Sequence, residues 1–111
     1  MDEVNRSDIR CVVIVAEAVI EERLLTRLDD CGATGWTVCP ARGHGPADRR
    51  MSEIEGGNVR IEVLAAPTTA DRIWRMMQKE FFPNYSVTAW EYHAAVARGQ
   101  RYTAGGDTGR D

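Results

Sequence analysis

The segment from Asp30 to Gly45 most constrains the fold, because it holds a helix end, a turn, a strand and a loop entrance. Gly32 is placed to take the left-handed conformation that ends many helices. Residues 36–39, Trp-Thr-Val-Cys, suit a strand. Residues 42–45, Arg-Gly-His-Gly, then offer backbone N–H groups beside a fixed positive charge. The segment therefore predicts a helix–turn–strand unit that leads into a loop able to hold an anion.

Hydrophobic periodicity predicts three further strands. Residues 9–16 are apolar on both alternating faces, which is typical of a central strand with both faces covered. Residues 58–65 alternate between apolar and charged side chains, which indicates a half-buried strand. Residues 86–97 form the last strand. The strand inside the segment from Asp30 to Gly45 is expected to run over residues 36–42.

Two stretches have the spacing of amphipathic helices. The first lies between the strands 9–16 and 36–42, and the second begins at Thr68, where Asp71 resembles the acidic partner of a capping box. The apolar stripes of the two helices are Ile20, Leu24, Leu28 and Cys31, and Ala70, Ile73, Trp74, Met77 and Phe81.

The order β-α-β-β-α-β predicts an α+β, ferredoxin-like fold in residues 1–98, followed by a flexible glycine-rich tail over 99–111. In such a fold both helices cover the same face of the sheet. The strands 9–16 and 86–97 carry apolar groups toward the other face as well, and a monomer would expose them. We therefore expect an oligomer built on the open face of the sheet.

The charge and cysteine content narrow the class of protein. A net charge of −3 argues against nucleic-acid binding, which needs a basic surface. The longest early apolar run, residues 11–16, is too short to span a bilayer, and a cytoplasmic location is expected. Cys11, Cys31 and Cys39 have no C-x-x-C spacing, so buried thiols are expected rather than a metal or redox site.

Residues 43–57 have no usable periodicity and contain glycine, proline and many charges. A loop of this length in a small domain is usually functional or disordered. Clustered metal ligands and a nucleophile–base pair are both missing from the sequence pattern. No catalytic residue and no metal site are therefore predicted.

Three stretches resemble the PII signalling superfamily. They are Gly-Ala-Thr-Gly-Trp-Thr-Val at 32–38, Gly-His-Gly at 43–45, and Asn-Val-Arg-Ile-Glu-Val at 58–63. The resemblance covers about residues 9–98 and implies that 43–57 is the family's T-loop, the loop between the second and third strands. The chain departs from nitrogen-regulatory PII proteins at Pro46-Ala47, where those proteins carry Arg-Gln, and it lacks their tyrosine in the T-loop.

The short junction Phe-Phe-Pro-Asn-Tyr at 81–85 is closer to PII-like proteins linked to carboxysomes and bicarbonate transporters. That resemblance implies a homotrimer that binds an adenine nucleotide, ADP or AMP, between subunits, with bicarbonate as a candidate second ligand. It implies no cofactor, and a protein partner that binds through the T-loop, such as a bicarbonate transporter or a carboxysome component. The preferred nucleotide and the partner stay open.

Carried over by position, the resemblance places Thr37 and Leu64 near the adenine and ribose. The phosphates, and the candidate bicarbonate, would lie at Arg42, Gly43, His44 and Gly45. Arg98 would be a further nucleotide contact, and Arg49 and Arg50 are cationic candidates in the T-loop.

The function predicted is therefore a non-enzymatic signalling protein in inorganic-carbon metabolism, with weak nucleotide hydrolysis left open. The alternative is a metal-tolerance protein or an enzyme on the same trimeric scaffold, because a fold does not determine a function.

Overall fold

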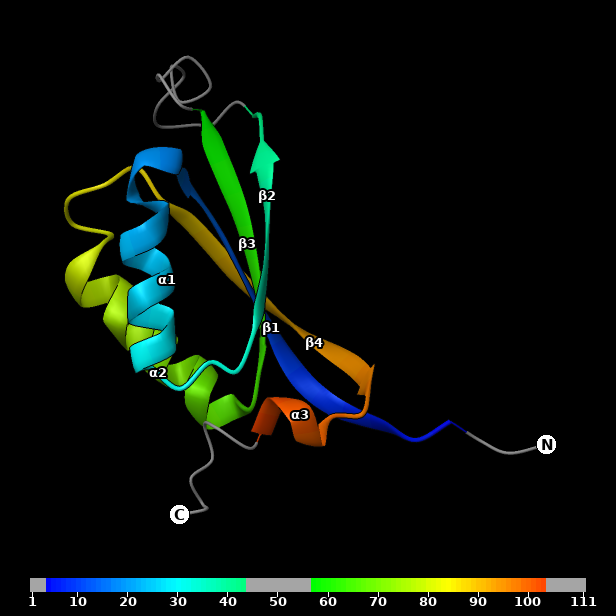
Figure 1. The fold of residues 1–111 in the computed structure, drawn as a ribbon. Coiled ribbons are helices and arrows are strands. Elements are labelled where there is room, and N and C mark those ends of the chain that lie inside the picture. Colours follow the sequence, from blue (N-terminus) through cyan, green and yellow to red (C-terminus); the bar gives the residue numbers. More distant parts are fainter. Residues whose placement is uncertain (1–3, 44–56, 104–111) are drawn as a thin grey trace.

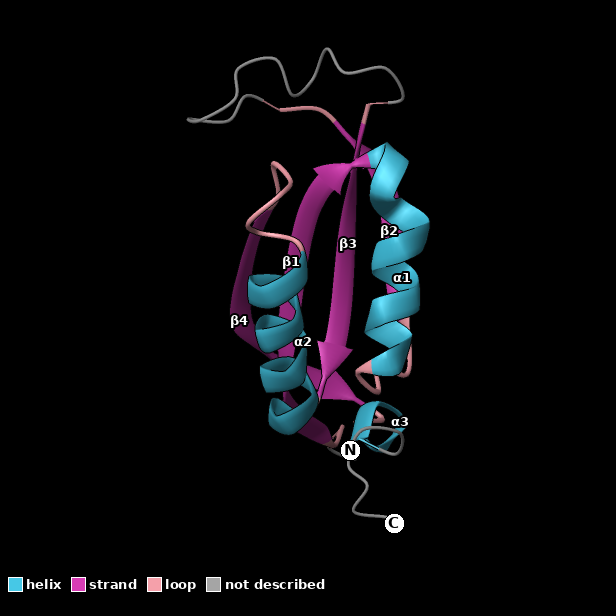
Figure 2. Cartoon of the chain, turned by 90° about the vertical axis from the view of Figure 1, so that its left-hand side faces the viewer, coloured by secondary structure: helices cyan, strands magenta, loops and turns pink. Residues whose placement is uncertain are grey.

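The computed structural model describes residues 4–43 and 57–103. Helices α1 (Glu21–Asp30) and α2 (Pro67–Glu80) lie side by side on one face of a four-stranded sheet (Figure 1, Figure 2). All neighbouring strands are antiparallel. The fold is the predicted α+β, ferredoxin-like one. In sheet order the strands are β2 (Trp36–Ala41), β3 (Asn58–Ala65), β1 (Arg6–Glu17) and β4 (Thr88–Ala97).

The core lies between the two helices and the sheet, and both predicted helix stripes contribute to it. Leu24 and Leu28 of α1 and Ile73, Met77 and Phe81 of the second stripe are completely buried there. Trp74 is only partly buried, because its indole N–H donates a 2.8 Å hydrogen bond to the Glu91 carboxylate of β4. The sheet supplies Val12, Ile14, Ile61 and Val63 to the same core.

The turn after α1 has the geometry that the sequence predicts. Gly32 has a φ of 99°, in the left-handed region. Its N–H bonds to the carbonyl of Asp29 at 3.0 Å, and the N–H of Ala33 bonds to the carbonyl of Leu28 at 3.1 Å. These are the two hydrogen bonds of a Schellman motif, which satisfies the last carbonyls of the helix.

The start of α2 differs from the prediction. The helix begins at Pro67, and Ala66 before it makes no side-chain cap. The capping box expected from Thr68 and Asp71 is therefore wrong. Proline at the first helical position has a φ suited to the helix and lacks only an N–H that would have no intrahelical partner, so it starts the helix one residue earlier.

Three strand bounds also differ from the prediction: β1 starts before residue 9, β2 ends at Ala41 instead of Arg42, and β4 starts at Thr88 instead of Ser86. β1 starts at Arg6, three residues before the predicted strand, because residues 6–8 pair with residues 95–97 of β4. After β4 the chain turns and forms a short helix, α3 (Gln100–Thr103), in the stretch predicted as a tail. Residues 104–111 and most of the predicted T-loop lie outside the described residues.

The face of the sheet opposite the helices is apolar at its centre. Trp90 and Tyr92 of β4 are 38% and 45% exposed, while Cys11 and Val13 of β1, beside them in register, are buried. The Tyr92 phenol is hydrogen-bonded to the Cys11 thiol, which raises the pKa of Tyr92. Of the three cysteines, Cys39 is exposed, so the expectation of buried thiols is wrong for that residue.

Candidate functional site

A hollow of about 220 Å³ lies where β2 starts and β3 ends. Thr37 is opposite Glu62 in the β2–β3 register, and Leu64 is two residues further along β3 on the same face of the sheet. The hollow therefore brings together the two residues predicted to lie near an adenine and a ribose. Its full lining is Gly35, Trp36, Thr37, Glu62, Leu64 and Tyr102.

The lining combines aromatic and apolar walls with two polar groups. Leu64 and Tyr102 provide the apolar surface, while Thr37 and Glu62 provide a hydroxyl and a carboxylate. Arg60 donates hydrogen bonds to the Glu62 carboxylate at 2.8 and 3.1 Å, which fixes that carboxylate on the strand. Such a mixture is typical of sites for small molecules that have a flat apolar part and a few polar atoms.

The predicted phosphate residues lie at the opposite end of β2. Arg42 and Gly43 follow the strand directly and are exposed. Five strand steps separate Thr37 from Arg42, a distance of about 17 Å. One subunit therefore presents its two predicted contact regions along one edge of the sheet, not in one pocket. His44, Gly45, Arg49 and Arg50 lie outside the described residues.

Arg98 lies in the turn between β4 and α3, with a φ of 59°. The turn is at the same end of the sheet as the hollow, since the end of β4 pairs with the start of β1 (Figure 1). Arg98 does not line the hollow. Within one subunit the structure thus separates Arg98 from Arg42.

Sequence reasoning missed four residues of the hollow. Gly35, Trp36 and Glu62 lie inside the motifs at 32–38 and 58–63, so their neighbours in those motifs could have pointed to them. Tyr102 follows the last strand in a stretch without periodicity, and no sequence pattern could have placed it.

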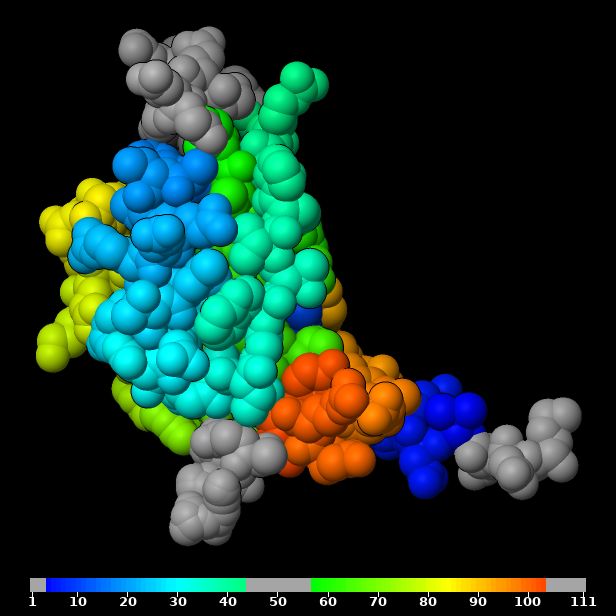
Figure 3. Space-filling model, viewed as in Figure 1, coloured from blue at the N-terminus to red at the C-terminus, as the bar shows by residue number. Residues whose placement is uncertain are grey.

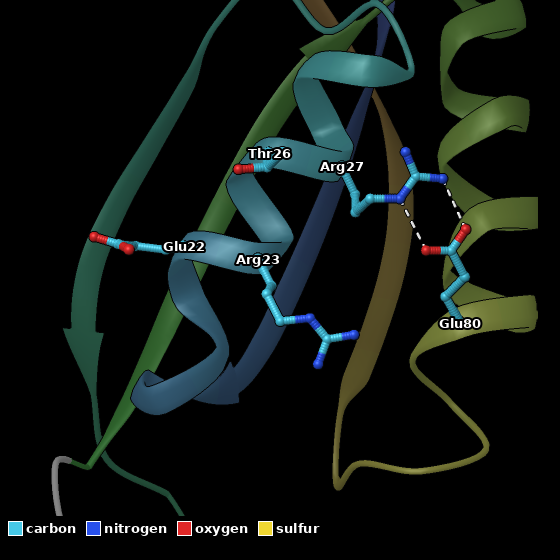
Figure 4. A pocket seen from close by; sticks show the side chains of 5 residues that line it. All are labelled: Glu22, Arg23, Thr26, Arg27 and Glu80. Carbon is cyan, nitrogen blue, oxygen red and sulfur yellow. Dashed lines mark hydrogen bonds and ion pairs between the residues drawn. The ribbon is translucent and has the colours of Figure 1, made fainter.

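A second hollow, of about 300 Å³, lies between α1 and α2 (Figure 4). Arg27, one of the two arginines that line this hollow, donates two hydrogen bonds to Glu80, at 2.7 and 2.8 Å, and a third to Asp30 at 2.6 Å. Arg23 lies over the rings of Phe81 and Tyr85, 5.4 and 5.5 Å from their centroids. These side chains contact one another across the two helices. We therefore interpret the hollow as part of the packing between α1 and α2, not as a ligand site.

A Glu80→Gln variant is expected to melt at a lower temperature than wild type at pH 7. The hydrogen bonds from Arg27 lower the pKa of Glu80, so this ion pair stabilises the fold above the unfolded pKa of about 4.3 and is lost as pH falls through the lower folded value. Thermal melts from pH 7 to pH 3 should therefore show the two proteins converging in acid.

The control for this variant is Glu22→Gln, because Glu22 is exposed and points away from both arginines in Figure 4. It should melt like wild type at every pH. A Glu80→Gln protein whose melting temperature stays parallel to that of wild type down to pH 3 would contradict the role of the ion pair.

Within residues 4–43 and 57–103, no three His, Cys, Asp or Glu side chains gather closely enough to hold a metal ion. No helix in the same ranges is long and apolar enough to cross a membrane.

Comparison with known proteins decides the family. The family model of the nitrogen regulatory protein P-II matches residues 9–100. This chain belongs to the P-II family. A solved structure assigned to the PII-like signalling proteins, from Thermus thermophilus, is 37% identical, covers 88% of this chain and 98% of its own, and has a TM-score of 0.77. The predicted PII-like resemblance is therefore confirmed. No match was found among curated proteins.

More distant P-II structures share the fold. CPII from Thiomonas intermedia K12, bound to ADP, AMP and bicarbonate, has a TM-score of 0.81 at 16% identity, over 90% of this chain and 98% of its own. GlnK of B. subtilis has a TM-score of 0.58 at 17% identity, and the match covers 79% of this chain and 86% of GlnK. PII-like proteins are signalling proteins that form trimers, so the predicted trimer follows from the family.

Proposed function

We propose that this protein is a PII-like sensor of adenine nucleotides that signals to another protein through the loop between β2 and β3. The hollow at the start of β2 is the observation that carries the proposal. It joins Thr37 and Leu64, the two residues that the PII resemblance assigned to the adenine and ribose, beside an aromatic wall. CPII, which has the same fold, was solved with ADP and AMP bound.

In this proposal the nucleotide runs along the edge strand β2. Its base occupies the hollow, and its phosphates extend toward Arg42, Gly43, His44 and Gly45. Glycine permits close approach of the backbone to an anion, and arginine binds phosphate oxygens through two N–H groups. Since Arg98 is remote from Arg42 within one subunit, it reaches the phosphates from a neighbouring subunit.

The open face of the sheet supports the trimer that this arrangement needs. Its exposed Trp90 and Tyr92 offer a large apolar surface that a partner subunit would cover. Assembly through this face places β2 of one copy near a second copy, so the nucleotide would lie in a cleft between subunits.

Bicarbonate is the proposed second ligand, at the base of the loop that follows Arg42. Backbone N–H groups of Gly43, His44 and Gly45 and one guanidinium provide donors for a small planar anion. A structure of CPII with bicarbonate and ADP supports the proposal. Arg49 and Arg50 would contact the protein partner, a bicarbonate transporter or carboxysome component in the cytoplasm.

Calorimetry with ADP and AMP tests the proposed function. Wild-type protein should bind one or both, and Arg42→Ala should weaken binding by about 1.5–3 kcal/mol, because a hydrogen bond to a charged group is lost. The control is Arg75→Ala, which removes an exposed arginine of α2 on the other face of the sheet. Wild-type protein that binds neither nucleotide would overturn the proposal.

Repeating the ADP titration with millimolar bicarbonate tests the second ligand. Two anions at neighbouring sites interact, so bicarbonate should change the affinity for ADP, and ADP must change that for bicarbonate by the same factor. Chloride at equal ionic strength and pH is the control. Identical curves in bicarbonate and chloride would leave a sensor of nucleotide alone.

A metal-tolerance protein or an enzyme on the same scaffold is the second candidate. The described residues hold no cluster of metal ligands, which favours the sensor. Calorimetry with divalent metal ions beside the ADP titration separates the two, because metal binding without nucleotide binding would favour the second candidate.

A further inference from the structure

Tyr102 is the one residue of the β2–β3 hollow that comes from outside the sheet and the turn before it. It belongs to α3, which follows the last strand of the ferredoxin-like fold. Figure 3 shows α3 against the end of β3, in agreement with the contacts between these two elements. The segment after β4 thus closes one side of the hollow.

The position of α3 is determined by the turn that precedes it. Arg98 takes a left-handed φ of 59°, which reverses the chain after β4. Gly99 is buried against β1, and a Cβ there would lie 2.4 Å from the Cβ of Ser7. The N–H of Tyr102 donates to the carbonyl of Gly99 at 2.9 Å. The turn therefore packs on the β1–β4 pair and directs Tyr102 back toward β3.

The surroundings of Tyr102 suit a flat apolar ligand group. The ring shares the hollow with Leu64, while the polar groups of Thr37 and Glu62 lie on the strands. Tyr102 itself is partly buried. An aromatic ring in such a place contacts the face of a nucleobase, and the strand residues are left to contact its edge.

We propose that Tyr102 is a nucleobase-contacting residue, supplied by the same subunit that supplies Thr37 and Leu64. The proposal rests on the proposed nucleotide-binding function and adds α3 to the site. It makes the segment after β4 part of ligand recognition: when a nucleotide binds, its base packs against Tyr102 and holds α3 on the end of β3.

Calorimetry with ADP on three full-length variants tests the proposal. Tyr102→Ala should weaken binding by roughly 5- to 160-fold, the range for loss of a base–aromatic contact. Tyr102→Phe keeps the ring and should stay within about twofold of wild type. Thr103→Ala is the matched control, because Thr103 lies on α3 and outside the lining of the hollow. Far-UV circular dichroism verifies that each variant is folded.

A fourth variant tests the contribution of the turn independently. Gly99→Ala keeps every residue of the hollow and forces the turn away from Ser7, because the added Cβ would overlap the serine side chain. It should displace α3 and weaken ADP binding in the same direction as Tyr102→Ala. Wild-type affinity in this variant would show that the placement of α3 has no role.

The outcomes separate this inference from the proposed function. If wild-type protein binds ADP and Tyr102→Ala binds it equally well or more tightly, Tyr102 is not a base contact, although the nucleotide-binding function stands. If Tyr102→Phe loses as much affinity as Tyr102→Ala, the ring contact is refuted. If wild-type protein binds no adenine nucleotide, both the function and this inference fail.

Discussion

A Phe81→Ala variant is expected to lose about 3–5 kcal/mol of unfolding free energy, the cost of removing a fully buried aromatic side chain. Phe81 has no exposed surface and lies where α2 ends above the sheet. The centroid of its ring is 5.8 Å from the centroid of the Tyr85 ring. The Arg23 guanidinium lies 5.4 Å from the centroid of the Phe81 ring. The substitution would therefore leave a cavity between the helices and also remove one of the two rings over which Arg23 lies.

Urea unfolding at a fixed protomer concentration measures this loss, since the stability of an oligomer depends on concentration. The matched control is Phe82→Ala, because Phe82 is the next residue and only partly buried. Its loss should be clearly smaller. A Phe81→Ala protein within about 1 kcal/mol of wild type would mean that the helices close over the vacated space.

Local pattern predicted most of the fold. The strand at 58–65 was predicted with its observed ends, because the side chains of β3 alternate between the core and the opposite face. The stripes of α1 and α2 identified the core, and Gly32 identified the end of α1, because each depends on residues close in sequence.

The features that local pattern missed depend on distant residues. Residues 6–8 are polar, and they form a strand because residues 95–97 pair with them. Likewise, α3 is placed by the contact between Gly99 and Ser7, which no periodicity reveals.

The candidate site was predictable only in part, for a related reason. The family resemblance predicts Thr37 and Leu64, and the sheet register brings them to one hollow. Tyr102 reaches that hollow through the fold alone. Arg42 and Arg98 lie apart within a subunit. Whether Arg42 of one subunit lies near Arg98 of another depends on how the subunits assemble, and the sequence indicates that assembly only through the family resemblance.

A Trp90→Asp variant is expected to convert the trimer, about 37 kDa or three times the 12.4 kDa chain, into monomers. Trp90 lies on the open face, 38% exposed, with the Arg60 guanidinium 5.6 Å from its ring. In an assembled trimer the aspartate carboxylate would be buried away from water. The free-energy cost of removing this charge from water is far larger than the stabilisation that a surface ion pair with Arg60 would provide. Light scattering at micromolar concentration measures the mass.

The control for this variant introduces the same charge elsewhere. Val19 is 76% exposed on the helical side of the molecule, so Val19→Asp should remain a trimer. A trimeric Trp90→Asp protein would place the subunit interface away from this face. Titration of the variant with ADP adds a second readout. A monomer that no longer binds ADP indicates that a neighbouring subunit completes the cleft. A monomer that binds ADP like wild type would show that β2, β3 and α3 of one subunit make the whole site.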